Sequence, residues 1–570
     1  MKIASIGLPL LAFWVSLSLQ ADAAITLVGD HSPMYNGVSD PWEITGQFGE
    51  NVELTIGGSS FGTLAMSGGS RIENHHTTIG RDVGAFGSVF LSGAGTQWDM
   101  TNLRIGIGGR GEFEIRNGAF VNAFGVSIGP QNDGFDSASH LIIDGPGSSL
   151  NNRNIDIGID GSLEVSGGGS ILSSNQNFRI GTNSGSTGYV SLTGESSSIN
   201  VGGDLEVNGF GVLDIADGGL LINSSSSIGG FNNSGAVNIR GDRDGVGSSV
   251  WSNTATMEIE NGGTVNQYGG RVIVDNGLYI SRLGLGLGEA TYNLFSGVLD
   301  LQGSLLFASN DAVFNLAGGF IENPGGIDLG QAFVLGGGGV LSPGNSPGIT
   351  QINRGFIVED GTLKIELDAL TGAGVGHDQV IVYGEIDLLG DTLQPEGDLE
   401  IQLNFAPELG NKFIIVDNDG NDPIVGEFIQ GTSVNYVYED LQYELGIDYA
   451  GGDGNDIVLT VLSIGDGLVD LAGDHNGDGF VSQADLDLVL LNWGDDTVPD
   501  GWAGGVSAFD GAISQNELDD VLLNWGDGTR PASSAIPEPS TLAVTALLGL
   551  TGLHRRHRYL CPQTRGHLEL

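Results

Sequence analysis

The chain has 570 residues, enough for several domains, and it combines 98 glycines with only 16 prolines. That balance excludes collagen and a proline-rich linker. The 70 Asp and Glu residues outnumber the 20 Lys and Arg residues, and the formal net charge of −50 repels phosphate backbones, so we expect no nucleic-acid partner. The same charge suits cations, calcium above all. The single cysteine, Cys561, leaves no intrachain disulfide.

Residues 1–23 have the order of a secretory signal peptide. Met1-Lys2 is a charged start, an apolar run follows from Ile3 to Leu19, and Ala21-Asp22-Ala23 is a small-residue cleavage site. The apolar run is short for a membrane anchor. We therefore expect cleavage after Ala23 and export of the mature chain.

Internal repeats in residues 24–340 determine the predicted fold. One pattern starts at a glycine and then alternates apolar and polar residues, with copies 49, 50 and 50 residues apart. These copies start at Gly62, Gly111, Gly161 and Gly211. A second marker, an Ile-Gly step, recurs about every 25 residues between Ile79 and Ile228. This spacing is typical of a solenoid.

The alternation has period two, so it predicts strands with one face inward and one face in water. In this register Leu163 and Val165 face the core and Glu164 faces outward. Glycine supplies the corners between strands. We predict a mainly β chain in which residues 24–340 form a right-handed parallel β-helix. About eleven coils between Gly62 and Leu341 would make a stack roughly 50 Å long. A β-sandwich is the alternative, and the near-constant spacing disfavours it.

The Gly-rich repeats resemble those of autotransporter passenger domains and related bacterial surface proteins. The resemblance continues through Leu341-Ser-Pro-Gly-Asn-Ser-Pro-Gly348, His377-Asp-Gln-Val-Ile-Val382 and Asp456-Ile-Val-Leu-Thr460. It implies a β-rich closing segment over residues 341–463. It names a scaffold and carries no chemistry of its own.

A twelve-residue segment from position 474 has the spacing of a calcium loop. A hard cation takes six or more oxygen ligands, and this spacing wraps them around one point. The predicted ligands are Asp474, Asn476 and Asp478, the carbonyl of Phe480, Ser482 and Asp485. The positions that follow predict an amphipathic helix, with apolar residues at Leu486, Val489, Leu490 and Trp493.

The loop and helix repeat 32 residues later, but the second loop is incomplete. Val506 and Ala508 replace its first and third ligands, while Asp510 remains at the fifth position and Glu517 at the twelfth. We expect one calcium ion in residues 464–530. The duplicated EF-hand-like unit resembles a dockerin repeat, which implies calcium-dependent folding and docking onto a cohesin-like partner.

Residues 531–570 contain three elements in the order of a sorting signal. Pro537-Glu538-Pro539 precedes an apolar run from Leu542 to Leu553, and Arg555-Arg556 lies in the basic cluster that follows. The order resembles the PEP-CTERM signal, which implies processing by an exosortase near the Pro-Glu-Pro motif. We expect a C-terminal hydrophobic helix that contacts the membrane only before processing, with the basic cluster on the cytoplasmic side.

No group of residues stands out as catalytic, so we expect that the chain is not an enzyme. The adjacent His75 and His76 are expected on opposite faces of a strand, which prevents a shared metal. Gly106-Ile-Gly-Gly-Arg-Gly111 spells a dinucleotide motif but leads into a strand pattern instead of a helix.

These features together predict an exported cell-surface protein with a structural or adhesive role, associated with exopolysaccharide or the outer envelope. One alternative is a polysaccharide-degrading β-helix enzyme, a lyase or glycosidase. Another is a carbohydrate-binding matrix protein that uses exposed Trp98 or Trp251, although both tryptophans fit a core or corner position equally well.

Overall fold

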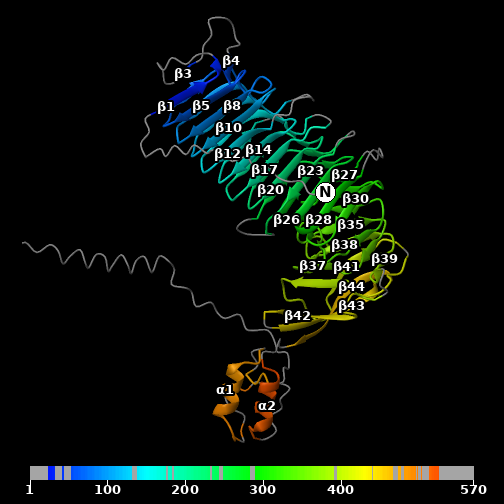
Figure 1. The fold of residues 1–570 in the computed structure, drawn as a ribbon. Coiled ribbons are helices and arrows are strands. Elements are labelled where there is room, and N and C mark those ends of the chain that lie inside the picture. Colours follow the sequence, from blue (N-terminus) through cyan, green and yellow to red (C-terminus); the bar gives the residue numbers. More distant parts are fainter. Residues whose placement is uncertain are drawn as a thin grey trace, which may run out of the picture. The chain divides into compact units, whose positions relative to one another are not determined.

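Figure 1 shows the fold as a computed structural model, in which the chain divides into two compact units. The first unit comprises Met1–Tyr436 and Glu444–Leu462, and the second comprises Val437–Tyr443 and Ser463–Leu570. The structure describes residues 23–32, 42–43, 53–130, 138–174, 177–182, 185–230, 234–242, 248–282, 289–390, 394–420, 422–439, 441–465, 473–476, 480–495, 497, 502 and 512–525. Within these ranges the chain is mainly β, with a solenoid of about 11 turns and two short helices, as the sequence predicts.

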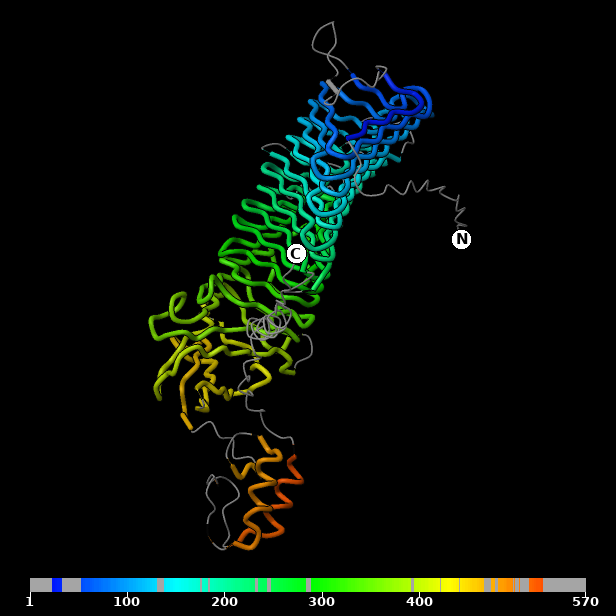
Figure 2. Tube along the Cα trace, turned by 90° about the vertical axis from the view of Figure 1, so that its left-hand side faces the viewer, coloured from blue at the N-terminus to red at the C-terminus, as the bar shows by residue number. Residues whose placement is uncertain are grey.

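Parallel strands of the first unit stack in three columns, so that a turn of the chain adds one strand to each column (Figure 2). The first column contains β5 (Phe61–Ser67), β8 (Phe86–Ser92), β10 (Arg110–Arg116), β12 (Ser139–Asp144), β14 (Gly161–Ser166), β17 (Tyr189–Thr193), β20 (Val212–Ala216), β23 (Ala236–Ile239), β26 (Thr264–Val274), β28 (Ala290–Asp300) and β30 (Ala312–Leu316). The alternative of two packed antiparallel sheets is thereby wrong for this part of the chain.

The second and third columns share three long strands that bend around a corner. The second column contains β3 (Trp42–Glu43), β6 (Arg71–Glu73), β9 (Gln97–Ile105), β11 (Phe120–Ile128), β13 (Ser149–Ile157), β15 (Ser170–Ser173), β18 (Ser198–Val201), β21 (Leu220–Asn223), β24 (Val250–Asn253), the ends of β26 and β28, β31 (Phe320–Glu322), β34 (Val340–Ser342), β37 (Thr362–Leu367) and β40 (Asp398–Leu403). The third contains β4 (Glu53–Ile56), β7 (His76–Ile79), the ends of β9, β11 and β13, β16 (Phe178–Ile180), β19 (Leu205–Val207), β22 (Ser226–Ile228), β25 (Met257–Ile259), β27 (Leu278–Ile280), β29 (Leu305–Ala308), β32 (Gly326–Asp328), β35 (Ile349–Asn353), β38 (Gln379–Tyr383) and β41 (Lys412–Asn418).

Antiparallel strands lie at both ends of this stack. β1 (Ala24–Gly29) pairs with β5 and β2 (His31–Ser32) with β4, while β44 (Asp456–Gly465) pairs with β41. The remaining strands are β33 (Phe333–Leu335), β36 (Phe356–Val358) and β39 (Ile386–Asp387), which form a small parallel sheet, together with β42 (Ser433–Tyr438) and β43 (Leu441–Gly451).

The core consists of inward side chains that align from one turn to the next. Leu163 and Val165 of β14 are fully buried, while Glu164 between them is exposed, so the predicted inward–outward register is confirmed. In the neighbouring turns Val165 aligns with Ile143 and Leu192, which are also fully buried. Each inward rung therefore packs on the rung before and after it, which makes one continuous core.

Parallel pairing continues past residue 341, where the sequence predicts a closing segment. β34 pairs with β37 and β37 with β40 in one column, while β35 pairs with β38 and β38 with β41 in another. Asp378 fastens the start of this segment, because its carboxylate accepts the N–H groups of Gly348 at 2.7 Å and Glu366 at 2.9 Å. The first part of the segment thus adds further turns to the same stack.

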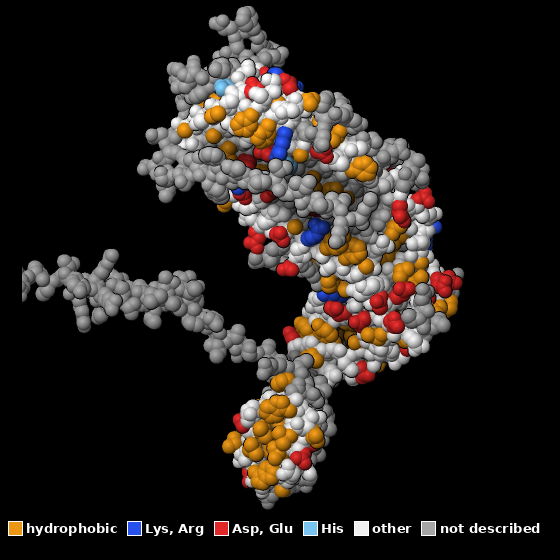
Figure 3. All heavy atoms as spheres, viewed as in Figure 1, with side chains coloured by type: hydrophobic (Ala, Val, Ile, Leu, Met, Phe, Trp, Pro, Cys, Tyr) orange, Lys and Arg blue, Asp and Glu red, His pale blue; other side chains and the backbone are white. Residues whose placement is uncertain are grey.

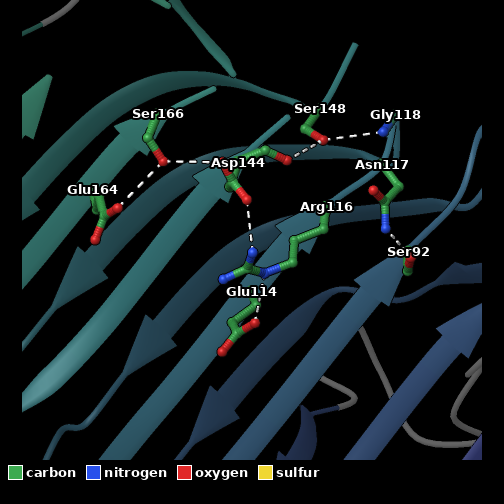
Figure 4. Close-up of polar contacts among 9 residues, drawn as sticks. All are labelled: Ser92, Glu114, Arg116, Asn117, Gly118, Asp144, Ser148, Glu164 and Ser166. Carbon is green, nitrogen blue, oxygen red and sulfur yellow. Dashed lines mark hydrogen bonds and ion pairs between the residues drawn. The ribbon is translucent and has the colours of Figure 1, made fainter. Parts of the chain in front are cut away.

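Buried hydroxyl groups link one turn to the next at a recurring corner. Ser148 Oγ accepts the N–H of Gly118 at 3.0 Å and donates to the carbonyl of Asp144 at 2.8 Å (Figure 4). Ser197 accepts the N–H of Gly168 at 2.9 Å in the same way. The hydroxyl satisfies a backbone donor of the preceding turn that would otherwise be buried without a partner.

The second unit contains the two helices, α1 (Gln483–Leu491) and α2 (Gln515–Leu523). Val481, Val489, Ile513 and Val521 form its small buried core. Reciprocal backbone hydrogen bonds hold the two halves together, from Gly494 to Ile513 at 2.9 Å and from Ile513 to Asp495 at 3.0 Å.

Candidate calcium site and surface groups

Each helix of the second unit begins at a serine that caps it. Ser482 Oγ accepts the N–H of Ala484 at 3.2 Å, and the carboxylate of Asp485 accepts the N–H of Ser482 at 2.8 Å. At α2 the carboxylate of Glu517 accepts the N–H of Ser514 at 2.7 Å. Such capping boxes satisfy the N–H groups that the first turn of a helix leaves unpaired.

Asp485, the predicted twelfth ligand, folds back onto its own loop. Its Oδ1 accepts the N–H of Asn476 at 3.0 Å, and its Oδ2 accepts the N–H of Ser482. The side chain is fully buried, and Asp474, the predicted first ligand, is 8% exposed. The structure therefore brings Asp485 to Asn476 and Ser482, the predicted third and ninth positions of the loop. Asp478, the predicted fifth position, lies outside the described residues.

The donor chemistry of the loop fits a hard cation. Asp474, Asp485 and the half-buried Asn476 supply side-chain oxygens, and Phe480 at the seventh position is also half-buried. No Lys or Arg occurs between residues 413 and 529, so no such side chain from this stretch can neutralise the buried carboxylates. Within the described residues no three His, Cys, Asp or Glu side chains are grouped closely enough to hold a metal.

The second half-loop keeps its cap at Glu517. Burial disfavours the charged form of this carboxylate, but backbone hydrogen bonds, first from Ser514, outweigh burial and hold the pKa of Glu517 below its usual value. Val506, Ala508 and Asp510, the predicted first, third and fifth positions, lie outside the described residues. The contacts of the Glu517 carboxylate with Ser514 are those of a helix cap.

His475 connects the two halves and was missed by the sequence analysis. Its Nε2 donates to the carbonyl oxygen of Glu517 at 3.1 Å, and its ring stacks on Trp502 with 4.3 Å between centroids. The histidine occupies the second position of the loop, where calcium-loop spacing assigns no ligand, so the pattern gave no signal for this packing role.

Identical apolar residues of the two helices remain exposed. The sequence predicts Leu490 and Trp493 on one apolar helix face with Val489, but of these three only Val489 is buried. The short helix presents a narrow face to its partner, and it ends at Leu491, so Trp493 lies beyond it. Hydrophobic side chains gather on this unit in Figure 3. The exposed set consists of Leu490, Leu491 and Trp493 and their counterparts Leu522, Leu523 and Trp525.

Carboxylates on the outer face of the solenoid are held by partners in neighbouring turns. Arg116 of β10 pairs with Glu114 at 2.8 Å and with Asp144 of β12 at 2.6 Å (Figure 4). Ser166 Oγ of β14 lies 3.1 Å from Asp144 Oδ1 and 3.2 Å from Glu164 Oε1, and its one hydroxyl proton can be donated to either carboxylate. This row of acidic residues crosses three turns and links them, which is a structural role.

Trp98 and Trp251 are fully buried, which excludes direct stacking of either ring on a surface glycan. The indole N–H of Trp98 donates to Asn74 at 2.7 Å, and that of Trp251 donates to Asn223 at 2.8 Å. The sequence allowed either a core or a corner position for these tryptophans, and both lie in the core.

His75 and His76 do not point to opposite faces, so that expectation is wrong. Their rings stack with 4.8 Å between centroids, because β7 begins only at His76 and His75 lies in the corner before it. Thr101 and Asn102 of the next turn are their hydrogen-bond partners. By contrast, the predicted strand after Gly106 is confirmed as β10, which leaves no helix for a dinucleotide site.

The sorting-signal residues Pro537, Glu538, Pro539, Arg555 and Arg556 lie outside the described residues, as does the predicted hydrophobic helix of that region. Within the described part of the chain, neither helix is long and apolar enough to cross a membrane.

Comparison with known proteins found no matching family model and no matching curated protein.

Proposed function

We propose that this chain is an exported cell-surface protein with a structural or adhesive role, associated with exopolysaccharide or the outer envelope. The observation that carries the proposal is the uninterrupted parallel pairing from β5 to β41, with polar groups of the outer face linked between turns. Such a stack is suited to holding attached modules at a distance from the cell. The solenoid is proposed to wind to the right, because crossovers between parallel strands usually have this hand.

Export and sorting rest on the two ends of the sequence. Residues 1–23 act as the signal peptide, and an exosortase-type enzyme processes the chain near Pro537-Glu538-Pro539. The apolar run beyond this motif contacts the membrane only until processing, with Arg555 and Arg556 on the cytoplasmic side.

The second unit is proposed to be a dockerin-like module folded around one calcium ion. Asp474, Asn476 and Asp478, the carbonyl of Phe480, Ser482 and Asp485 would hold the ion. Calcium would neutralise the two buried carboxylates and so stabilise the loop against α1.

The exposed apolar residues of the two helices support a role in docking. Residues 489–495 and 521–527 have the same sequence, Val-Leu-Leu-Asn-Trp-Gly-Asp, so each helix, with the tryptophan that follows it, offers the same apolar side chains to a partner. Exposed apolar patches of this kind mark protein interaction sites. A cohesin-like protein is the partner that the dockerin resemblance implies.

Two measurements on the producing cells test the proposal. Protease added to intact cells should remove an epitope inserted in the solenoid, whereas a cytoplasmic marker should survive. Mass spectrometry of the surface protein should find no peptide beyond roughly residue 545. A protected epitope in intact cells, or surface protein that still ends at Leu570, contradicts the surface location or the processing, respectively.

A further inference from the structure

A groove of about 370 Å³ crosses three successive turns of the solenoid at β11, β13 and β15. Its lining residues are Asn122, Ala123, Phe124, Asn151, Asn152, Arg153, Leu172 and Ser174. Asn122 of β11 aligns with Asn151 of β13 and then with Leu172 of β15, so the groove wall is built from side chains in register.

The described lining residues carry one formal charge, and it is positive. No carboxylate is among them, although the chain as a whole carries a net charge of −50. The side chain of Arg153 lies over the ring of Phe124, with its guanidinium carbon 4.7 Å from the ring centre. Arg153 has no carboxylate partner among the described residues, whereas most described Arg side chains are in ion pairs. No described carboxylate therefore takes up the hydrogen-bond donors of this guanidinium.

Apolar and amide groups complete the lining. Phe124 is 50% exposed and Leu172 is 47% exposed, so both offer an apolar surface to the groove. In the floor, Asn152 is 5% exposed and donates from Nδ2 to Ser173 Oγ at 3.2 Å. Asn152 Oδ1 has no donor among the described residues. This oxygen is enclosed beneath the strands on the inward face, so Asn152 supports the floor, and a ligand would meet the outward side chains of Asn122 and Asn151.

We propose that this groove binds a carboxylate-bearing saccharide, such as a uronic acid unit of a polysaccharide. The planar guanidinium of Arg153 can hold a carboxylate through two parallel hydrogen bonds. The face of a pyranose carries C–H groups that pack against Phe124 and Leu172, while Asn122 and Asn151 offer donors and acceptors to its hydroxyl groups. Charges elsewhere on the chain are screened beyond about 8 Å at physiological ionic strength, so the positive charge of Arg153 determines which sign of ligand charge the groove attracts.

The inference deepens the proposed association with exopolysaccharide, on which it rests, by naming a site and a ligand class. The test is titration calorimetry of the purified, exported chain with oligogalacturonate, oligoglucuronate and oligomannuronate of matched length. The methyl ester of each oligosaccharide removes the charge and keeps the sugar. We expect binding of at least one acid form and a loss of about tenfold or more in affinity for its ester.

Variants assign the binding to the groove. Arg153→Gln keeps hydrogen-bonding capacity without charge and should weaken binding about tenfold or more, while Phe124→Ala should weaken the acid and the ester alike. Arg104→Gln is the matched control, since Arg104 is exposed on β9, lines no part of the groove and has no carboxylate partner among the described residues. Its affinity should stay within about twofold of the parent.

Three outcomes would overturn the inference: no binding of any acid oligosaccharide at millimolar concentration, equal binding of acid and ester, or unchanged affinity in Arg153→Gln. Because Arg153 and Phe124 are exposed, both variants should fold, and circular dichroism checks this. The titration uses purified protein, so its failure leaves the surface location intact. Conversely, a protein found inside the cell would remove the proposed function without changing an affinity measured for the groove.

Discussion

Replacing Val165 by Asp tests the arrangement of the solenoid core at its most sensitive point. Val165 is fully buried and lies in register between Ile143 and Leu192, so a carboxylate there would face only apolar neighbours along the stack. At pH 7 the buried group would have to stay protonated. Raising its pKa by about three units costs about 4 kcal/mol, and the lost burial of valine adds about 1.5–2 kcal/mol.

The expected loss of about 6 kcal/mol is of the order of the whole stability of many domains. Urea unfolding followed by far-UV circular dichroism measures this loss. Glu164→Gln is the matched control, because Glu164 is the neighbouring outward residue and its replacement should change the free energy of unfolding by less than about 0.5 kcal/mol.

The pH dependence separates the charge from the loss of packing. The carboxyl of Val165→Asp would have a raised pKa in the folded state, so its destabilisation should be fully present at pH 7. Near pH 4 about half of the unfolded chains also carry a proton at this carboxyl, and most of the 4 kcal/mol should be recovered. Equal losses in Val165→Asp and Glu164→Gln, or a loss that does not depend on pH, would refute the inward–outward register.

Three further predictions concern other parts of the chain. Calorimetry should find one tightly bound calcium ion, and Asp474→Ala should abolish this binding. The control Asp487→Ala, at an exposed residue of α1, should leave the binding unchanged. Two sites of equal affinity would contradict the prediction that the second loop binds no calcium. Burial raises the pKa of Asp378 to about 7, so its contribution to the free energy of unfolding should fall by up to about 4 kcal/mol as the pH rises from 4 to 7. Asp378→Asn should flatten this slope in urea titrations, and an unchanged slope would exclude Asp378 as its source. Ser197→Ala should cost about 1–3 kcal/mol of stability, because it leaves the N–H of Gly168 without its acceptor, and a silent change would show that water replaces the hydroxyl.

The direction of side chains within a turn could be predicted from the sequence. Alternation is a local property, since successive residues of a strand point to opposite faces, and Leu163, Glu164 and Val165 therefore lie where their order requires. The same rule failed at His75, because it holds only inside a strand and gives no warning that β7 starts one residue later.

Neighbours along the stack could not be predicted, because the turns differ in length. Leu141 aligns with Leu163, 22 residues later, whereas Leu221 aligns with Trp251, 30 residues later. A mean spacing of about 25 does not tell which side chains meet across turns. The ion pairs of Arg116, the buried position of Trp98 and the groove at Arg153 all depend on those meetings, and so they emerge only from the structure.

At the loop of the second unit, spacing was informative about chemistry but not about packing. The oxygen-bearing residues follow from the twelve-residue pattern, and the return of Asp485 to Asn476 agrees with it. The narrow buried face of α1 could not be predicted, since nine helical residues against one partner bury few side chains. Nor could the end of the helix at Leu491, which leaves Trp493 beyond it and half exposed.

The stacking of parallel turns has a mechanical consequence. Hydrogen bonds between turns point along the stack, and each turn is bonded only to the ones before and after it. Tension along that direction would pass through every turn, but only a turn at an end of the stack can peel away, so its bonds would break first. Each detached turn of about 25 residues would release roughly 80–90 Å of extended chain. A pulled molecule would then lengthen in steps and dissipate work at each step.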